Sequence, residues 1–149
     1  MVDFKDTIAI GGDHAGYRLK QFLIENLEKE GYHFKDYGVL SEEAVDYPDI
    51  IHPLAKDIND GHVKMGVILC GSGNGVAITA NKYLNVRAAV CWNEEIVKLA
   101  RMHNDANVIA LPARFISYEK ALEFVRLFLT TGFEGGRHQR RVEKISKIN

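Results

Sequence analysis

The feature that most constrains this chain is a regular alternation between short apolar segments and segments whose apolar residues recur every three or four positions. The first pattern indicates β-strands and the second indicates amphipathic helices. Strands are predicted over residues 7–10, 33–37, 65–70, 87–91 and 108–111. Helices are predicted over residues 15–30, 50–60, from 76 onward, 93–101, between 117 and 132, and 138–148, with Asn93 and Ser117 as N-caps.

This order of elements predicts an α/β domain with a parallel sheet. Residues 65–70 are apolar without alternation, as expected for a strand that is covered on both faces. We therefore expect a three-layer α/β/α, Rossmann-like fold: a doubly wound, five-stranded parallel sheet with a C-terminal helix, formed as a single domain by residues 1–149. Ligands of such sheets bind at the carboxyl ends of the strands, so each motif can be judged by whether it follows or precedes a strand.

The composition excludes several other classes of protein. With 149 residues, 46% of them hydrophobic, and a net charge of −1, the chain can bury a core and differs from a disordered one. Two cysteines are too few for a disulfide scaffold, and no apolar run approaches the roughly 20 residues of a membrane span. Acidic residues stand where a signal peptide needs basic ones. We expect a cytoplasmic protein that binds neither membrane nor nucleic acid.

A glycine-rich segment, Gly71-Ser72-Gly73-Asn74-Gly75, follows the strand predicted at 65–70 and precedes a helix. Three glycines in five residues allow a tight turn that leaves backbone amides exposed, and amides at a helix N-terminus bind anions. The segment lacks the Gly-Lys-Ser/Thr of a nucleotide P-loop, and Val76 replaces the last glycine of the dinucleotide pattern. It is either an anion-binding loop or a tight turn without a ligand.

The two cysteines differ in their surroundings. Cys70 ends a predicted strand beside the glycine-rich loop, where nearby amides favour a thiolate, although a buried apolar thiol is the alternative. Cys91 has no such neighbour and is expected to be a core residue. Asp13 and His14 follow the first predicted strand, so they form a polar pair at the ligand-binding edge, or Asp13 simply caps the next helix.

Other polar residues allow two readings each. His103 and Asn104 precede the last predicted strand, so they lie at the edge of the sheet opposite to the ligand-binding edge of their own chain. They either form a capping turn or reach the site of a neighbouring subunit. Residues 137–149 carry a net charge of +4 against −5 for the rest, and Arg137 and Arg141 share one helix face. That pair suits a phosphate or carboxylate, or is a solvated helix end. Tyr47 lies in a turn or at a site rim.

No spacing typical of a metal site occurs, and the scattered histidines at 52, 62 and 138 receive no role. Together, however, the polar motifs resemble the type B ribose-5-phosphate isomerases, a family that includes the allose- and galactose-6-phosphate isomerases. The matching segments follow the family order across nearly the whole chain: residues 12–16, 46–48, 70–75, 80–82, 103–107 and 135–138.

The resemblance implies an aldose–ketose isomerase of the pentose phosphate pathway that interconverts D-ribose 5-phosphate and D-ribulose 5-phosphate through a cis-enediolate, without a metal or other cofactor. It implies that Cys70 is the base, that His103 opens the sugar ring, and that Asp13 assists at the ring oxygens. The remaining implied contacts are the amides of Gly71, Gly73, Asn74 and Gly75 with Ser72 for the enediolate oxygen, His14, Arg114, Arg137 and Arg141 for the phosphate, and Tyr47 and Asn104 for the sugar.

The resemblance also implies a homodimer whose sites are shared between subunits, or a dimer of such dimers. One branch of the family uses the cysteine as base and another uses a glutamate directly after the glycine-rich loop. Val76 occupies the glutamate position here and cannot accept a proton, so the resemblance leaves Cys70 as the base. Two alternatives stay open. The substrate could be a six-carbon sugar phosphate, allose 6-phosphate or galactose 6-phosphate. The chain could also be a non-catalytic nucleotide- or sugar-phosphate-binding module in which Asp36 contacts a ribose.

Overall fold

The computed structural model describes residues 2–3 and 5–148 of the chain. Its elements follow the predicted order: β1 (Thr7–Gly12), a 3-10 turn η1 (His14–Gly16), α1 (Tyr17–Lys29), β2 (His33–Asp36), α2 (Tyr47–Asn59), β3 (Gly66–Cys70), α3 (Asn74–Ala80), β4 (Ala88–Val90), α4 (Glu94–Met102), β5 (Val108–Pro112), α5 (Tyr118–Thr130) and α6 (Arg137–Ile145). Among these described residues, no helix has both the length and the apolar character needed to cross a membrane.

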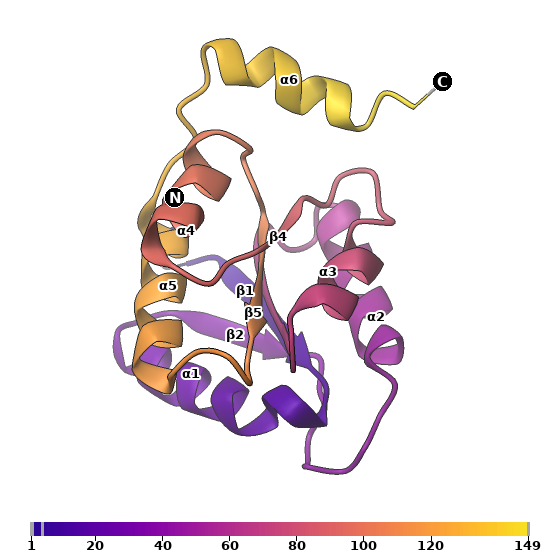
Figure 1. Ribbon diagram of the computed structural model, residues 1–149, viewed down its shortest axis with the longest axis vertical. Helices are drawn as coiled ribbons and strands as arrows, with labels where there is room; N and C mark the ends of the chain where they lie inside the picture. Colours follow the sequence, from indigo (N-terminus) through magenta and orange to yellow (C-terminus); the bar gives the residue numbers. More distant parts are fainter. Residues whose placement is uncertain (1, 4, 149) are drawn as a thin grey trace.

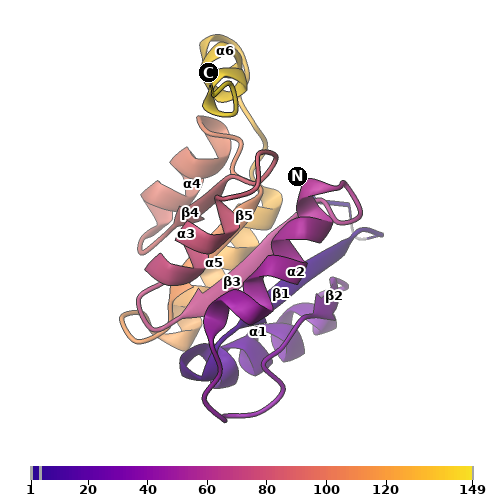
Figure 2. The same ribbon diagram turned by 90° about the vertical axis from the view of Figure 1, so that its right-hand side faces the viewer.

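The described strands form one parallel sheet in the order β2-β1-β3-β5-β4. Figures 1 and 2 show helices on both faces of this sheet, α2 and α3 on one side and α1, α4 and α5 on the other. The predicted five-stranded, three-layer α/β/α fold is therefore confirmed. Every residue of β3 is buried, as the unbroken apolar pattern of residues 65–70 predicts, and every residue of β5 is buried as well.

Apolar side chains form a separate core on each face of the sheet. On one face, Leu23 of α1 and Phe128 of α5 pack against β1, β3 and β5. On the other face, Leu54 of α2 and Val76 of α3 pack against the same strands. The helical spacing of apolar residues is therefore the property that fixes each helix to its face.

The start of α2 lies earlier than the sequence indicates. The pattern predicts a turn at Tyr47 and Pro48 with the helix from residue 50, whereas the helix already begins at Tyr47. Proline is tolerated in the first turn because its missing N–H has no partner there in any helix. The two predicted caps are confirmed, since Asn93 accepts a hydrogen bond from the amide of Ile96 and Ser117 accepts one from Lys120.

The strand order reverses between β1 and β3. From β1 the chain moves outward to β2, and from β3 it moves to the other half of the sheet, which holds β5 and β4. We call the side on which the parallel strands end the carboxyl edge, and the opposite side the amino edge. Ligands of doubly wound sheets bind at the carboxyl edge beside such a reversal. Helix α6 lies past the amino edge, apart from the other helices (Figure 2).

Candidate active site

Most of the predicted site residues come together at the carboxyl edge, where β1 and β3 end. The backbones of these strands approach so closely that a Cβ on Gly12 would lie 2.5 Å from the carbonyl oxygen of Leu69. Glycine is therefore required at this position, because any side chain would collide with backbone. The close approach brings the loop after β1 beside the loop after β3.

Cys70 is the last residue of β3, and its side chain lies under the glycine-rich loop. The amide of Gly73 donates a hydrogen bond of 3.2 Å to Cys70 Sγ. Gly73 adopts a positive φ of 79°, a conformation that glycine favours, and the turn aims its amide back toward the sulfur. The thiol is 6% exposed. It is therefore held in place by the loop that follows it.

Tyr47 and Arg114 pack directly on the glycine-rich loop. A Cβ on Gly75 would lie 2.6 Å from Cζ of the Tyr47 ring, and a Cβ on Gly71 would lie 3.2 Å from Nη1 of Arg114. The amide of Arg114 also donates to the carbonyl of Gly71. Ser72 accepts a hydrogen bond from the amide of Asn74 and is exposed at the loop tip. An aromatic ring and a guanidinium thus flank the loop, next to the thiol.

Asp13 and His14 line the same edge from the end of β1. Asp13 is buried, its amide bonds to the carbonyl of Leu69, and its Oδ1 accepts a hydrogen bond of 3.0 Å from the amide of Ala15. Asp13 therefore caps η1, in agreement with the hypothesis that it is a helix cap, and it also lies beside β3. Nδ1 of His14 is buried and has no hydrogen-bond partner among the residues that the structure describes.

The other predicted site residues lie at the amino edge. His103 and Asn104 follow α4, just before β5, and the neighbouring Asn107 accepts a hydrogen bond from the amide of Gly66, the first residue of β3. Cys70 ends the same strand, and five residues at roughly 3.3 Å each separate its two ends by more than about 13 Å. Arg137 and Arg141 are exposed on α6, on this side of the sheet (Figure 1). One chain therefore does not bring the two groups together.

His103 belongs to a small cluster that the sequence spacing did not indicate. Its ring stacks on that of His138, with centroids 4.1 Å apart and planes inclined by 13°, and Nε2 of His103 lies 3.7 Å from a carboxylate oxygen of Glu134. Burial, together with the positive charges of His103 and Arg137, lowers the pKa of His138. Two signals were available: His138 stands between two arginines of one helix turn, and both histidines lie in segments that match the family pattern, residues 103–107 and 135–138.

The donor atoms of His103, Glu134 and His138 all lie within 4.8 Å of one another, close enough to be considered for a metal ion. The two imidazole rings, however, are nearly parallel, so their in-plane lone pairs run side by side and do not converge on one point. A chelated transition metal requires converging donors. The cluster is therefore better suited to orient His103 than to hold a metal.

Several motif residues of the amino edge are bound to the backbone. The side chain of Asn81 bonds both the amide and the carbonyl of Ala88, at the start of β4. Asn107 accepts from the amide of Arg87, and the buried Arg101 donates to Asp105. Asp105 has a positive φ of 46°, which this network maintains. These residues shape the segment that presents His103 and Asn104.

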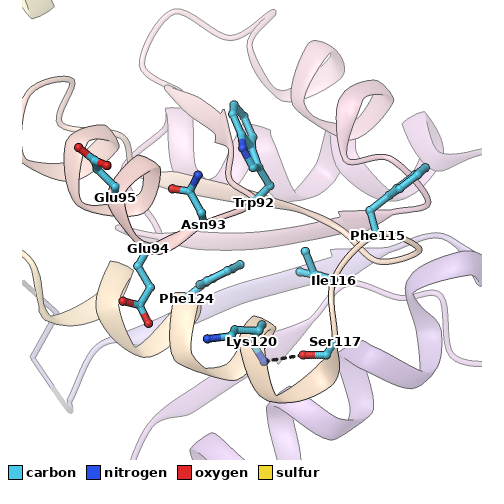
Figure 3. A pocket seen from close by; sticks show the side chains of 9 residues that line it. All are labelled: Trp92, Asn93, Glu94, Glu95, Phe115, Ile116, Ser117, Lys120 and Phe124. Atoms are coloured by element: carbon cyan, nitrogen blue, oxygen red, sulfur yellow. Dashed lines mark hydrogen bonds between the residues drawn. The ribbon is translucent and has the colours of Figure 1, made fainter.

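Cys91 lies in the core on the face of α1, α4 and α5, as the sequence predicts. It is 0% exposed, and burial raises the pKa of its thiol to about 12. A groove of about 620 Å³ opens near it between the N-terminal ends of α4 and α5 (Figure 3). None of the residues that line this groove is a predicted site residue. Its exposed rings, Trp92 and Phe115, form an apolar surface.

A doubly wound sheet that holds a thiol, a carboxylate and a glycine-rich amide loop at its strand reversal defines an α/β enzyme for small anionic substrates. The sequence matches the Ribose/Galactose Isomerase family over residues 8–145, and the chain belongs to this family. It is therefore an isomerase.

Individual relatives agree with this assignment. The chain is 40% identical to ribose-5-phosphate isomerase B of Escherichia coli over 141 residues, which cover 95% of each protein. The structure of ribose 5-phosphate isomerase B from Thermotoga maritima matches with a TM-score of 0.94 and 42% identity, covering 97% of this chain and 99% of that one. The corresponding enzyme of Mycoplasma genitalium, solved with bound ribulose-5-phosphate, matches with a TM-score of 0.92 and 37% identity, covering 96% and 95%.

Proposed function

We propose that this protein interconverts D-ribose 5-phosphate and D-ribulose 5-phosphate. The observation that carries the proposal is the thiol of Cys70, fixed by the amide of Gly73 at the end of β3 and flanked by Asp13 and by the glycine-rich loop. Aldose–ketose isomerisation needs a base at carbon and fixed donors at the oxygen that becomes negative. This edge of the sheet offers both. The names of the relatives support the choice of a five-carbon substrate.

The proposed reaction begins with ring opening. The C1–O4 bond of the cyclic sugar breaks, the C1 hydroxyl loses its proton, and O4 gains one, with His103 and Asp13 handling these protons. Cys70, as thiolate, then removes the proton from C2, and the electron pair of that bond forms the C1–C2 double bond of a cis-enediolate. The negative charge develops on O1, and a proton then passes from the O2 hydroxyl to O1. Formation of the C2–O2 carbonyl, with return of the proton from Cys70 to C1, gives the ketose. General-base catalysis of this kind contributes typically about 100- to 10,000-fold.

The glycine-rich loop is proposed to stabilise the enediolate, with Ser72 beside it. The amides of Gly73 and Asn74 donate to Cys70 Sγ and Ser72 Oγ within the chain, so the other amides of residues 71–75 are the donors proposed for the enediolate oxygen. Charge develops on oxygen in this step, and removal of one preorganised donor to such an oxygen typically costs about 100- to 1,000-fold in rate. Tyr47 packs on Gly75, so its ring lies beside the loop and is proposed to contact the sugar. Arg114, which packs on Gly71, and His14, whose Nδ1 has no hydrogen-bond partner among the residues that the structure describes, are proposed to contact the phosphate.

We further propose that a second copy of the chain completes the site. His103, Asn104, Arg137 and Arg141 lie at the amino edge, so in a homodimer they would serve the carboxyl edge of the partner. Large apolar side chains on α3, in the segments flanking β4 and in the loop after β5 are 57–75% exposed: Ile78, Leu84, Trp92 and Phe115. Because β4 is an edge strand, this surface suits burial against a second copy.

The alternative of a dinucleotide-binding module is disfavoured by Asp36. That carboxylate would have to face a ribose, but it accepts hydrogen bonds from Lys20 and from the amide of Gly38. We also place the protein in the cytoplasm, where reducing conditions would keep Cys70 and Cys91 as the free thiols that the structure contains.

The test is an isomerase assay on ribose 5-phosphate in the presence of EDTA. We expect full activity in the chelator, a loss of at least about 100-fold in kcat for Cys70→Ala, and little change for the matched control Cys91→Ala. Allose 6-phosphate and galactose 6-phosphate, assayed in parallel, should be poorer substrates. An unchanged rate in Cys70→Ala would show that the base is misassigned, and a preference for a six-carbon sugar would overturn the choice of substrate.

A further inference from the structure

A buried lysine near the carboxyl edge has no place in the reaction described above. Lys20 lies in α1, and its side chain is 0% exposed. An ammonium group is strongly destabilised in a protein interior unless it is paired and fully hydrogen-bonded. An apolar side chain of similar length would fill the same space without this requirement. The burial of this lysine is therefore best explained by the groups to which its ammonium group is hydrogen-bonded.

The ammonium group of Lys20 joins two parts of the chain that follow β2. Its Nζ donates to Oδ1 of Asp36 at 2.7 Å and to the carbonyl of Val39 at 2.5 Å. The same Oδ1 of Asp36 accepts a hydrogen bond of 2.9 Å from the amide of Gly38. The ring of Tyr17 lies 5.6 Å from Nζ and covers it on another side. Residues 36–39 are thus held as one unit by a buried charge.

This unit is bonded in turn to the residue before Asp13. The amide of Gly12 donates to the carbonyl of Gly38 at 2.8 Å, and the amide of Val39 donates to the carbonyl of Gly12 at 2.8 Å. Both backbone groups of Gly12 are therefore fixed by the segment that Lys20 anchors. Asp13 follows directly, and its own amide is bonded to Leu69 of β3.

We propose that Lys20 is a positioning residue for Asp13, acting through Asp36 and the backbone of Gly38 and Val39. The inference rests on the proposed role of Asp13 in ring opening. A displacement of about 1 Å in a reacting group can cost about 100-fold in rate, so loss of the anchor should impair ring opening. Proton transfer by Cys70 should be affected less, because Cys70 is held by the glycine-rich loop on β3.

Two assays separate these steps. Turnover of ribose 5-phosphate requires ring opening. Exchange of the C1 proton of ribulose 5-phosphate in D2O requires only the enediolate step, because that ketose is acyclic. For Lys20→Met we expect turnover to fall about 10- to 100-fold, while exchange stays within about threefold of wild type. Asp13→Asn should behave in the same way, and Cys70→Ala should lose both activities.

The double variant tests whether the lysine acts through the aspartate. In an Asp13→Asn background, Lys20→Met should reduce turnover by no more than about twofold, since residues that act through one another are not additive. Lys35→Met is the matched control, because Lys35 lies on β2 and is also paired with an aspartate, Asp57, yet is more than half exposed. We expect its turnover to match wild type.

Hydrogen exchange supplies a readout that does not depend on the reaction. The amides of Gly12 and Val39 should exchange at least roughly tenfold faster in Lys20→Met, and amides of β5 should not. If Lys20→Met does not fold, Asp36→Asn removes the same ion pair at a partly exposed position and should show the same effects.

Normal turnover in folded Lys20→Met, multiplied losses in the double variant, or equal loss of exchange and turnover would each overturn the inference. A fully active Asp13→Asn would instead contradict the proposed role of Asp13. A normal Lys20→Met beside an impaired Asp13→Asn would overturn the inference about the lysine alone.

Discussion

At the scale of the residue, identical side chains acquire different chemistry from their surroundings. Cys70 accepts a hydrogen bond from a loop amide, whereas the pKa of Cys91 is raised to about 12 by burial. Sequence position predicted this difference, because only Cys70 adjoins the glycine-rich loop. The burial of Lys20 was not predicted, although its spacing from Leu23 and Leu27 places it on the face of α1 that packs on the sheet.

The two thiols should differ in reactivity toward iodoacetamide. At pH 8 Cys91 stays protonated and 0% exposed, so we expect the native protein to be alkylated at Cys70 alone, with loss of activity. Cys91→Ala should be inactivated at the wild-type rate, and Cys70→Ala should incorporate no label unless it is first unfolded. Mass spectrometry of the labelled peptides checks this. Alkylation of native Cys91 at a comparable rate would contradict the expected protection.

His138 should make the stability of the protein depend on pH. Its pKa is lowered by burial and by nearby positive charges, so the folded state binds fewer protons than the unfolded state just below the ordinary histidine pKa. The contribution of neutral His138 to the free energy of unfolding is therefore present above about pH 6.5 and is lost as pH falls below that value. In urea unfolding, the free energy of unfolding should decrease less between pH 7.5 and pH 5 for His138→Gln than for wild type. His33→Gln, at an exposed position, should follow wild type.

At the scale of the element, the strands and helices could be predicted because their apolar spacing is the property that buries them. Their ends could be predicted less well. Helix α2 begins before its apolar pattern does, because Pro48 tolerates the first turn. The roles of single polar residues within a motif depend on contacts between elements. Asn81 and Asn107 stand in motifs of the site yet bond to backbone, which only their partners in space reveal.

The contact between the glycine-rich loop and α2 can be tested at Gly75. A methyl group there would lie 2.6 Å from the ring of Tyr47, so Gly75→Ala should displace the ring and leave the backbone intact. We expect kcat/KM to fall about tenfold, with no further loss when the substitution is made in a Tyr47→Ala background. Gly132→Ala is the control, because nothing lies within 4 Å of that position. Equal effects of the two alanines would refute the proposed contact.

A second contact between elements involves Asp57 of α2. Tyr37 donates to its carboxylate at 2.6 Å, and with Lys35 lowers the pKa of Asp57 to about 2. A lowered carboxyl pKa stabilises the folded state above about pH 4, and this contribution is lost as pH falls toward 2. At pH 7 the free energy of unfolding of Asp57→Asn should be lower than that of wild type by on the order of 2 kcal/mol. This difference in free energy should shrink below pH 4. Denaturant unfolding checks this, with the exposed Asp49→Asn as control.

At the scale of the whole molecule, the alternation of elements predicted the layers but not the strand order. The order β2-β1-β3-β5-β4 depends on which crossovers pack best, and no local pattern encodes it. The separation of the candidate site into two halves was nevertheless predictable. A helix that follows a parallel strand must return to the amino edge, so His103, at the end of α4, cannot lie beside Cys70 of its own chain.

The proposed sharing of sites between two chains can be tested by mixing inactive variants. Cys70→Ala and His103→Ala homodimers should each be inactive, because every site lacks one of the two residues. In a mixed dimer, one site would carry both substitutions and the other would carry neither. Random exchange of subunits makes half of the dimers mixed, so about a quarter of wild-type activity should return. The mixture is assayed after subunit exchange has been verified with differently tagged chains. Failure to recover activity would mean that His103 acts within its own chain or has no part in the reaction.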